Sequence, residues 1–275
     1  MTTDSSSGPG SSFNPAIAVP SRTYAAFRGA SKDAFPADRE AASELRKALD
    51  GMQVDEVIRE NAAALVRAVD FLAQEHLQFA DLGGGRPMQG LDQRKLPDLC
   101  QVAIQRQPER RWLLLDSDIT VVIAGRALIG GAGVAVVQED LRSPAEVVYA
   151  MDEHLDLGKR IVVILGAVLH FLTTEEVHAL MSELWACLTS GSVVAATHLT
   201  SADADPAKVA AGVAAYQANH GIDIYPRTRD EITALADPFV IRDPGVVSTI
   251  EFKPDPVGPT PVPAPHFLMW LADRP

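Results

Sequence analysis

The sequence predicts an α/β protein in which a mostly parallel sheet is covered by helices on both faces. Short continuous apolar runs alternate with segments of helical periodicity through the middle of the chain. Such runs are typical of strands that are buried on both faces, as the strands of parallel sheets are. With 275 residues, the chain is long enough for one large domain of this class with a well-buried core.

The N-terminal part is predicted to be a tail followed by a helical lid. Residues 1–21 are rich in Ser, Gly, Thr and Pro, which is typical of a disordered tail. Residues 22–75 form the predicted lid. A first helix is expected over 36–49, because Pro36 suits a first turn, and a second over 54–74, where apolar residues recur on one face.

Residues 76–275 form the predicted sheet domain. Thr173 and Glu176 have the spacing of a capping box and indicate where one of its helices begins. The apolar runs predict strands at 77–82, 112–115, 134–138, 161–165, 192–198, 239–242, 246–252 and 266–271. Helices are expected between them at 99–107, 119–128, 143–150, 173–188 and 208–219, with a short helix beginning near 228.

Composition excludes several classes of partner. The formal net charge is −12, with 36 acidic against 24 basic residues, so the chain repels nucleic-acid phosphates. No apolar run reaches the ~18 residues of a membrane helix, and the N-terminus lacks a signal-peptide pattern, so we expect a soluble cytoplasmic protein. Cys100 and Cys187 lack metal-type spacing, which predicts buried free thiols and no metal site.

A glycine-rich turn follows the first predicted strand directly. Asp81 ends the strand, and Gly83 and Gly85 allow positive φ and close approach of a ligand to the main chain. A turn of this kind before a helix can hold a nucleotide-like cofactor. The nicotinamide fingerprint is absent, since it needs a third glycine and an acid ~20 residues on, whereas Asp116 lies 35 residues beyond Asp81.

Three acids follow three successive strands. Asp81, Asp116 and Asp140 end the first, second and third strands, where open α/β sheets bind their ligands. Asp116 can accept both hydroxyls of a ribose, while Asp140 can accept an adenine amino proton beside the backbone N–H of Leu141. In the alternative interpretation, Asp116 and Asp140 only cap the helices that follow.

Several motifs, taken in order, resemble one known family. The chain is similar to the actinobacterial S-adenosylmethionine-dependent methyltransferases, which have a class I Rossmann-like fold and were formerly a family of unknown function. The resemblance covers about residues 22–271. The motifs that carry it include Phe35-Pro-Ala-Asp38, Gln78-Phe-Ala-Asp81-Leu-Gly83, Asp140-Leu-Arg-Ser-Pro144, Ala167-Val-Leu-His170-Phe and Pro226-Arg227-Thr-Arg-Asp-Glu231.

The resemblance implies a Rossmann-like methyltransferase domain at 76–275 that binds S-adenosylmethionine and methylates a small molecule in bacterial specialised metabolism, such as antibiotic biosynthesis. Asp81, Gly83 and Gly85 would line the methionine and ribose region. Asp116 would hold the ribose, and Asp140 with Leu141 the adenine. The segment from Ala167 to His170 would form the floor beneath the sulfonium.

Methyl transfer needs aligned reactants and, for an oxygen or nitrogen acceptor, a base. His170 follows the fourth strand and is either that base or a satisfied core histidine. Tyr24 and Asp33 are further catalytic candidates on the lid, and Lys32 is a candidate for substrate binding. The alternative for these three is a solvated arm.

Two further residues are predicted to bind substrate. His198 ends the fifth strand, and Arg227 can bind a carboxylate or phosphate.

The chain departs from the family pattern at the cofactor mouth. Its N-terminal motif, residues 24–33, lacks the family's first acid and second glycine, and the glycine loop lacks the usual threonine. Residues 86–96 look inserted. These changes leave two other functions open. One is an intramolecular substitution that closes a ring with loss of a leaving group and without a methyl donor, and the other is a non-catalytic partner that stabilises an active homologue. The expected assembly is a homo- or hetero-oligomer with a homologous chain.

Overall fold

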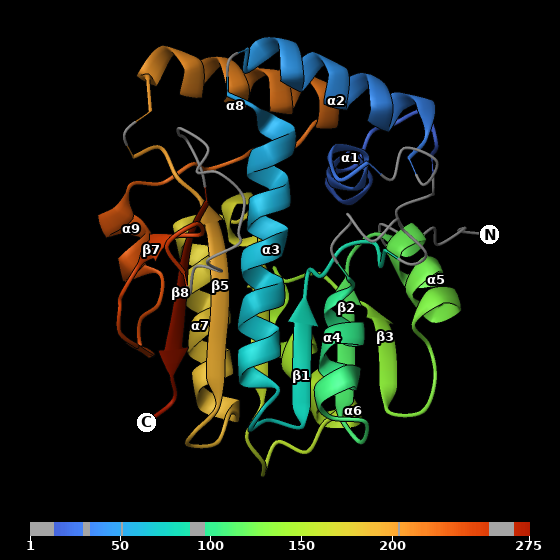
Figure 1. Cartoon of the computed structure of the whole chain (residues 1–275), viewed down its shortest axis with the longest axis vertical. Helices are drawn as coiled ribbons and strands as arrows, with labels where there is room; N and C mark the ends of the chain where they lie inside the picture. Colours follow the sequence, from blue (N-terminus) through green and yellow to red (C-terminus); the bar gives the residue numbers. More distant parts are fainter. Residues whose placement is uncertain (1–13, 30–33, 51, 89–96, 203, 253–266) are drawn as a thin grey trace, which may run out of the picture.

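The computed structural model describes residues 14–29, 34–50, 52–88, 97–202, 204–252 and 267–275. Its centre is one eight-stranded sheet with the order β3-β2-β1-β4-β5-β8-β6, in which β7 also pairs with β8 (Figure 1). β1 to β5 are parallel, whereas β6, β7 and β5 pair with β8 in antiparallel fashion. The strands are β1 Gln78–Leu82, β2 Arg111–Asp116, β3 Val134–Gln138, β4 Val162–Gly166, β5 Val193–Leu199, β6 Val240–Ile241, β7 Val247–Ser248 and β8 Phe267–Asp273.

Helices cover both faces of the sheet, as the apolar strands predict. Successive strand residues point to opposite faces: Phe79 and Trp112 pack on one, and Ala80 and Leu113 on the other. The first face is covered by α3 Val54–Leu72, α4 Leu99–Arg106 and α5 Ile119–Leu128, and the second by α6 Pro144–His154, α7 Thr174–Cys187 and the short α9 Arg229–Ala234. The α/β class is therefore confirmed. No helix in the described ranges is long and apolar enough to cross a bilayer.

The strand order reverses between β1 and β4. From β1 the chain continues outward to β2 and β3, and from β4 it continues to β5 on the other side. Ligands of open α/β sheets bind in the crevice at such a point, outside the carboxyl ends of the strands. In Figure 1 these ends point toward a separate layer of helices at the top of the molecule.

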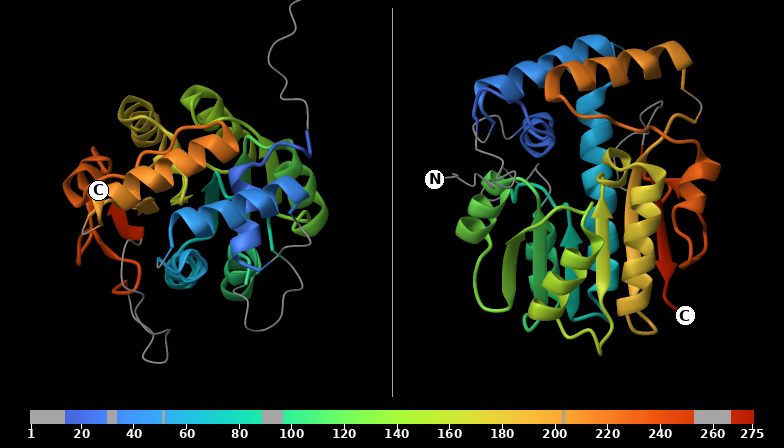
Figure 2. Two further views of the ribbon diagram at one scale, coloured as in Figure 1. Left: turned by 90° about the horizontal axis from the view of Figure 1, so that it is seen from above. Right: turned by 180° about the vertical axis from the view of Figure 1, so that it is seen from behind.

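That upper layer is a lid, and it differs from the predicted one. It contains α1 (Pro20–Phe27), α2 (Pro36–Ala48) and, beside α2, α8 (Pro206–His220), which is inserted after β5 (Figure 2). A Cβ on Gly212 of α8 would lie 2.8 Å from Leu49, so the two helices pack closely. The predicted lid, residues 22–75, lacks α8. It also includes α3, whose lower half packs on the sheet.

Several helices and strands begin or end at residues other than the predicted ones. α1 begins at Pro20, inside the predicted tail, whereas residues 1–13 lie outside the described residues. Two predicted strands, 239–242 and 246–252, are each reduced to two paired residues. Between them Pro244 cannot donate a ladder hydrogen bond, and after Ser248 the chain turns, because the Phe252 N–H donates to the Ser248 carbonyl. The proline-rich loop after residue 253 is outside the described ranges.

A buried ion pair fastens the lid. Arg22 Nε of α1 donates to Asp38 Oδ2 of α2 over 2.8 Å, and these side chains are 2% and 0% exposed. Asp38 also accepts the backbone N–H groups of Val19 and Phe35. Arg22 Nη1 lies 3.6 Å from Asp118, at the loop after β2. This pair therefore joins two lid helices to the edge of the crevice.

Candidate functional site

A cavity of about 640 Å³ lies between the lid and the carboxyl ends of the strands. This volume is in the range of small-molecule sites. Most of the residues singled out from the sequence line it together, although they are spread over more than a hundred positions of the chain. They are Tyr24, Asp81, Gly83, Gly85, Asp116, Asp140, Leu141, Ala167 and His170.

The turn after β1 requires glycine because of its close contacts and its positive φ angles. A Cβ on Gly83, whose φ is +70°, would lie 2.5 Å from Val168 across the crevice. A Cβ on Gly84 would lie 2.5 Å from the carboxylate of Asp81. Gly85 has φ +68° and donates its N–H to Asp116 over 3.0 Å. Sequence reasoning named the outer two glycines but missed the role of Gly84.

Asp81, Asp98 and Asp116 all line the cavity, and burial disfavours the charged form of each carboxyl group. Burial raises the pKa of Asp81 well above its usual range, with smaller contributions from Asp98 and Asp116. Burial also raises the pKa of Asp116 to about 6, although the N–H groups of Asp118 and Gly85 counteract it. The pKa of Asp98 is raised by burial as well. A cationic ligand would relieve this repulsion.

Asp98 was missed by sequence reasoning. Its carboxylate caps α4 by accepting the Cys100 N–H and also accepts the Met88 N–H. From the sequence it is an ordinary helix cap, and only the fold brings it near Asp81.

The capping alternative for the other two acids is wrong. The N-cap of α5 is Asp118, which accepts the Thr120 N–H, while Asp116 Oδ1 accepts the Asp118 N–H over 2.9 Å. The N-cap of α6 is Ser143, and Asp140 instead accepts the Arg142 N–H. Both acids therefore shape the loops at the cavity rather than the helix ends.

The loop after β4 is strained. Ala167 has φ +55°, in the left-handed region that favours glycine, and its N–H donates to Thr197 Oγ1 over 2.9 Å. Strain of this kind collects at functional sites when the surrounding structure enforces it.

Replacing Ala167 by glycine would release this strain. We expect Ala167→Gly to raise the free energy of unfolding by about 1 kcal/mol, since the left-handed region disfavours a Cβ by roughly that amount. Urea unfolding followed by circular dichroism measures this. A lower unfolding midpoint would show that the strain relieved at residue 167 is smaller than the conformational entropy that glycine adds to the unfolded chain.

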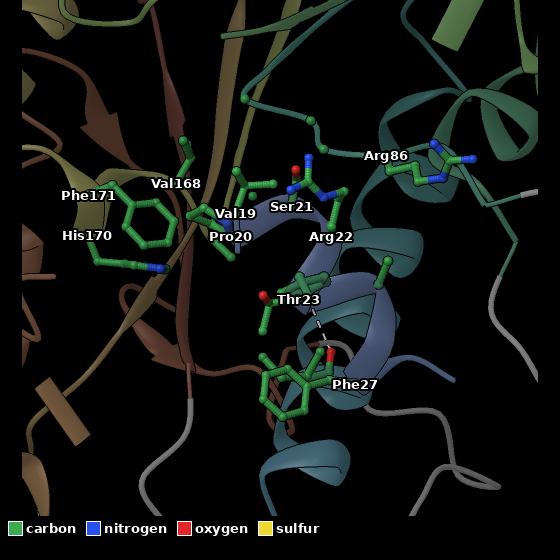
Figure 3. A pocket seen from close by; sticks show the side chains of 18 of the residues that line it. Val19, Pro20, Ser21, Arg22, Thr23, Phe27, Arg86, Val168, His170 and Phe171 are labelled. Atoms are coloured by element: carbon green, nitrogen blue, oxygen red, sulfur yellow. Dashed lines mark hydrogen bonds between the residues drawn. The ribbon is translucent and has the colours of Figure 1, made fainter. Parts of the chain in front are cut away.

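His170 is buried in the 3₁₀ turn Leu169–Phe171, which follows β4. Burial lowers the pKa of its imidazole well below the usual range, and His198 and Arg227 lower it further. Its Nδ1 has no hydrogen-bond partner among the described residues. In Figure 3 the ring points toward Val19 and Pro20. His170 therefore lines the cavity as a neutral imidazole with one buried ring nitrogen that the described residues leave without a hydrogen-bond partner.

Tyr24 lines the cavity, but its hydroxyl is engaged elsewhere. It accepts from Asn61 Nδ2 over 2.8 Å and donates to the Ile58 carbonyl over 3.3 Å, and burial raises its pKa. These contacts join α1 to α3 and indicate a positioning role. The predicted partners on the same motif, Lys32 and Asp33, lie outside the described residues.

His198 and Arg227 occupy positions that differ from their predicted role in substrate binding, because neither lines the cavity. Arg227 donates to the carbonyls of Leu169 and Leu172 over 3.2 and 2.8 Å. Its Nη1 also lies 2.8 Å from His198 Nε2. Burial lowers the pKa of His198 to about 4, so this ring stays neutral and accepts from the guanidinium. The pair holds the 3₁₀ turn that carries His170.

Comparisons with known proteins identify the family of the chain. No curated protein matches the chain. Residues 8–269 match the family model described as S-adenosyl methyltransferase. The chain belongs to this family.

Two solved structures of similar proteins come from actinobacteria. One, from Thermobifida fusca, is provisionally described as a methyltransferase; it is 28% identical with a TM-score of 0.81, over 94% of this chain and 95% of that one. The other, a duf574 family protein from Streptomyces avermitilis, is 26% identical with a TM-score of 0.83, over 94% and 98%. A structure named mitomycin 7-O-methyltransferase, 13% identical with a TM-score of 0.54 over 94% and 74%, shares the fold.

Proposed function

We propose that this protein uses S-adenosylmethionine to methylate a small molecule in the cytoplasm of a bacterium, as a step of specialised metabolism. The main supporting observation is that three strand-end acids from β1, β2 and β3 line one cavity at the switch point of the sheet. The lid restricts the cavity to a small-molecule volume, which disfavours a macromolecular acceptor.

The residues of the cavity fit S-adenosylmethionine. Asp116 would accept the ribose hydroxyls, and Asp140 with the Leu141 N–H would meet the adenine. The cluster around Asp81 suits the positive charges of the amino group and the sulfonium, since its carboxylates are buried together. Arg28 and Arg86 also line the cavity and suit a carboxylate. When bound, the cofactor supplies an electrophilic methyl carbon, and its sulfur keeps the electron pair of the broken bond.

The remaining chemistry belongs to the protein. The lid and the loop after β4 hold the two reactants in line and exclude water, which reduces the entropic cost of bringing them together for a displacement. A neutral imidazole nitrogen of His170 accepts the proton that the acceptor atom loses as its lone pair bonds to the methyl carbon.

Isothermal titration with S-adenosylmethionine and S-adenosylhomocysteine tests the cofactor assignment. We expect both to bind. Asp116→Ala and Asp140→Ala should each weaken binding about tenfold or more, because a hydrogen bond to a charged group contributes about 1.5–3 kcal/mol. Asp152→Ala, on the exposed face of α6, is the matched control and should leave affinity unchanged.

Two results would contradict the proposal. One is the absence of binding by the wild-type protein, and the other is wild-type affinity in both cavity variants. Product formation by cofactor-stripped protein without added donor would favour intramolecular substitution instead.

A further inference from the structure

The cavity has two chemically different parts. The part at the strand ends contains the carboxylates described above. The other part lies under α2, α3, α8 and the segment that follows α8. Among the residues that the structure describes, every cavity-lining side chain between 45 and 66 and between 209 and 226 is uncharged. We call these lining residues, together with Phe171, the lid chamber.

Part of the lid-chamber wall belongs to a separate apolar cluster in the lid. Leu45 is buried in this cluster, and Ile58 and Tyr216 pack against it. Leu65 and Val66, also in the wall, belong instead to the apolar cluster on one face of the sheet. An apolar ligand here gains about 25 cal/mol for each Å² of surface removed from water. An unpaired charge would lose several kcal/mol of solvation.

One side of the chamber is aromatic. The rings of Tyr216 and Phe171 lie 5.7 Å apart with 30° between their planes, and Phe171 lies 4.4 Å from the His170 ring. Tyr216 is fixed from behind by stacking on His220 at 4.2 Å. His220 Nε2 in turn lies 2.9 Å from Thr23 Oγ1 of α1, which links the two lid helices. The wall therefore runs from the lid to the candidate base, and its ring faces suit stacking with a flat ligand.

We infer that the methyl acceptor is an uncharged, largely apolar molecule with a planar ring, which lies in the lid chamber against Tyr216 and Phe171. The reacting heteroatom of the acceptor faces His170, which lies beside Phe171 at the end of the aromatic wall. The inference rests on the proposed function for the role of His170. The preference of the chamber for uncharged ligands follows from its lining alone.

A matched pair of probes tests the chamber without knowledge of the natural substrate. The complex of the full chain with S-adenosylhomocysteine is titrated with 2-naphthol and with 2-naphthoate, which have similar ring systems and differ in charge. We expect 2-naphthol to bind at least about tenfold more tightly, because the carboxylate would be desolvated without a partner. Val213→Asp places a charge on the chamber wall and should weaken 2-naphthol binding by about tenfold or more.

The control lies on the next residue of the same helix. Ala214 is exposed and does not line the cavity, so Ala214→Asp should leave 2-naphthol binding unchanged. Both variants should bind S-adenosylhomocysteine like the wild type, which shows that they are folded. Equal or tighter binding of 2-naphthoate, no binding of 2-naphthol, or an unaffected Val213→Asp would overturn the inference. Loss of S-adenosylhomocysteine binding by the wild type would instead overturn the proposed function.

Discussion

Asp81→Asn is expected to stabilise the free protein near pH 8 and to weaken S-adenosylmethionine binding by about tenfold or more. Asp81 is buried beside Asp98 and Asp116, and its pKa is raised well above the usual range. An amide of nearly the same shape removes the desolvation of the carboxylate. The same change removes a charged partner for the cationic ligand, so stability and affinity move in opposite directions.

The raised pKa of Asp81 determines how the stability of the wild-type protein changes with pH. Below the ordinary pKa of 3.8 both the folded and the unfolded protein hold the proton, and Asp81 does not affect stability. As the pH rises above 3.8, the unfolded state loses the proton first, so stability falls until the raised pKa of the folded state is passed. Each unit of this shift corresponds to about 1.4 kcal/mol.

Thermal unfolding of wild type and Asp81→Asn between about pH 4 and pH 8 measures the difference. The melting temperatures should diverge in favour of the variant as the pH rises. Asp152→Asn, at an exposed position of α6, should follow the wild type. Parallel curves, or a variant that binds S-adenosylmethionine normally, would contradict the role given to Asp81.

Asp38→Ala is expected to reduce the free energy of unfolding by about 3–5 kcal/mol, because it removes the fully buried carboxylate that accepts from Arg22 Nε at 2.8 Å. The backbone N–H groups of Val19 and Phe35 lose their acceptor at the same time. For a protein of this size the melting temperature should fall by roughly 2–4 °C for each kcal/mol. Differential scanning calorimetry provides the measurement.

The control for Asp38 is Glu40→Ala, an exposed change in the same helix that should be nearly neutral. Arg22→Ala should be less damaging than Asp38→Ala if the carboxylate is the main acceptor at this junction. Similar melting temperatures for wild type and Asp38→Ala would show that the ion pair does not hold the lid.

Much of the fold could be predicted because the strands have a strong local signal. Continuous apolar runs identified β1 to β5, and the residue that ends each run marks the crevice edge of a parallel sheet. Asp81, Asp116 and Asp140 could therefore be assigned to one site from their order alone. The capping pair Thr173 and Glu176 was equally local, and its reciprocal hydrogen bonds are present at the start of α7.

The remaining features depend on long-range packing. The helical pattern of α8 was recognised, but nothing local indicates that it crosses over the sheet to pack on α2. Arg227 was expected to bind the substrate because a guanidinium pairs well with a carboxylate or phosphate. Its partners are the carbonyls of a 3₁₀ turn 55 and 58 residues earlier in the chain. The helix that begins at Pro20 was not predicted, because its first residues belong to a segment with the composition of a disordered tail.

A crystal structure with S-adenosylhomocysteine tests the central claim most directly. The account predicts the ribose hydroxyls within hydrogen-bond distance of Asp116, the adenine beside Asp140 and Leu141, and the sulfur near the segment from Ala167 to His170. A ligand bound away from the ends of β1, β2 and β4, with Asp116 still making only its bonds to Gly85 and Asp118, would contradict it.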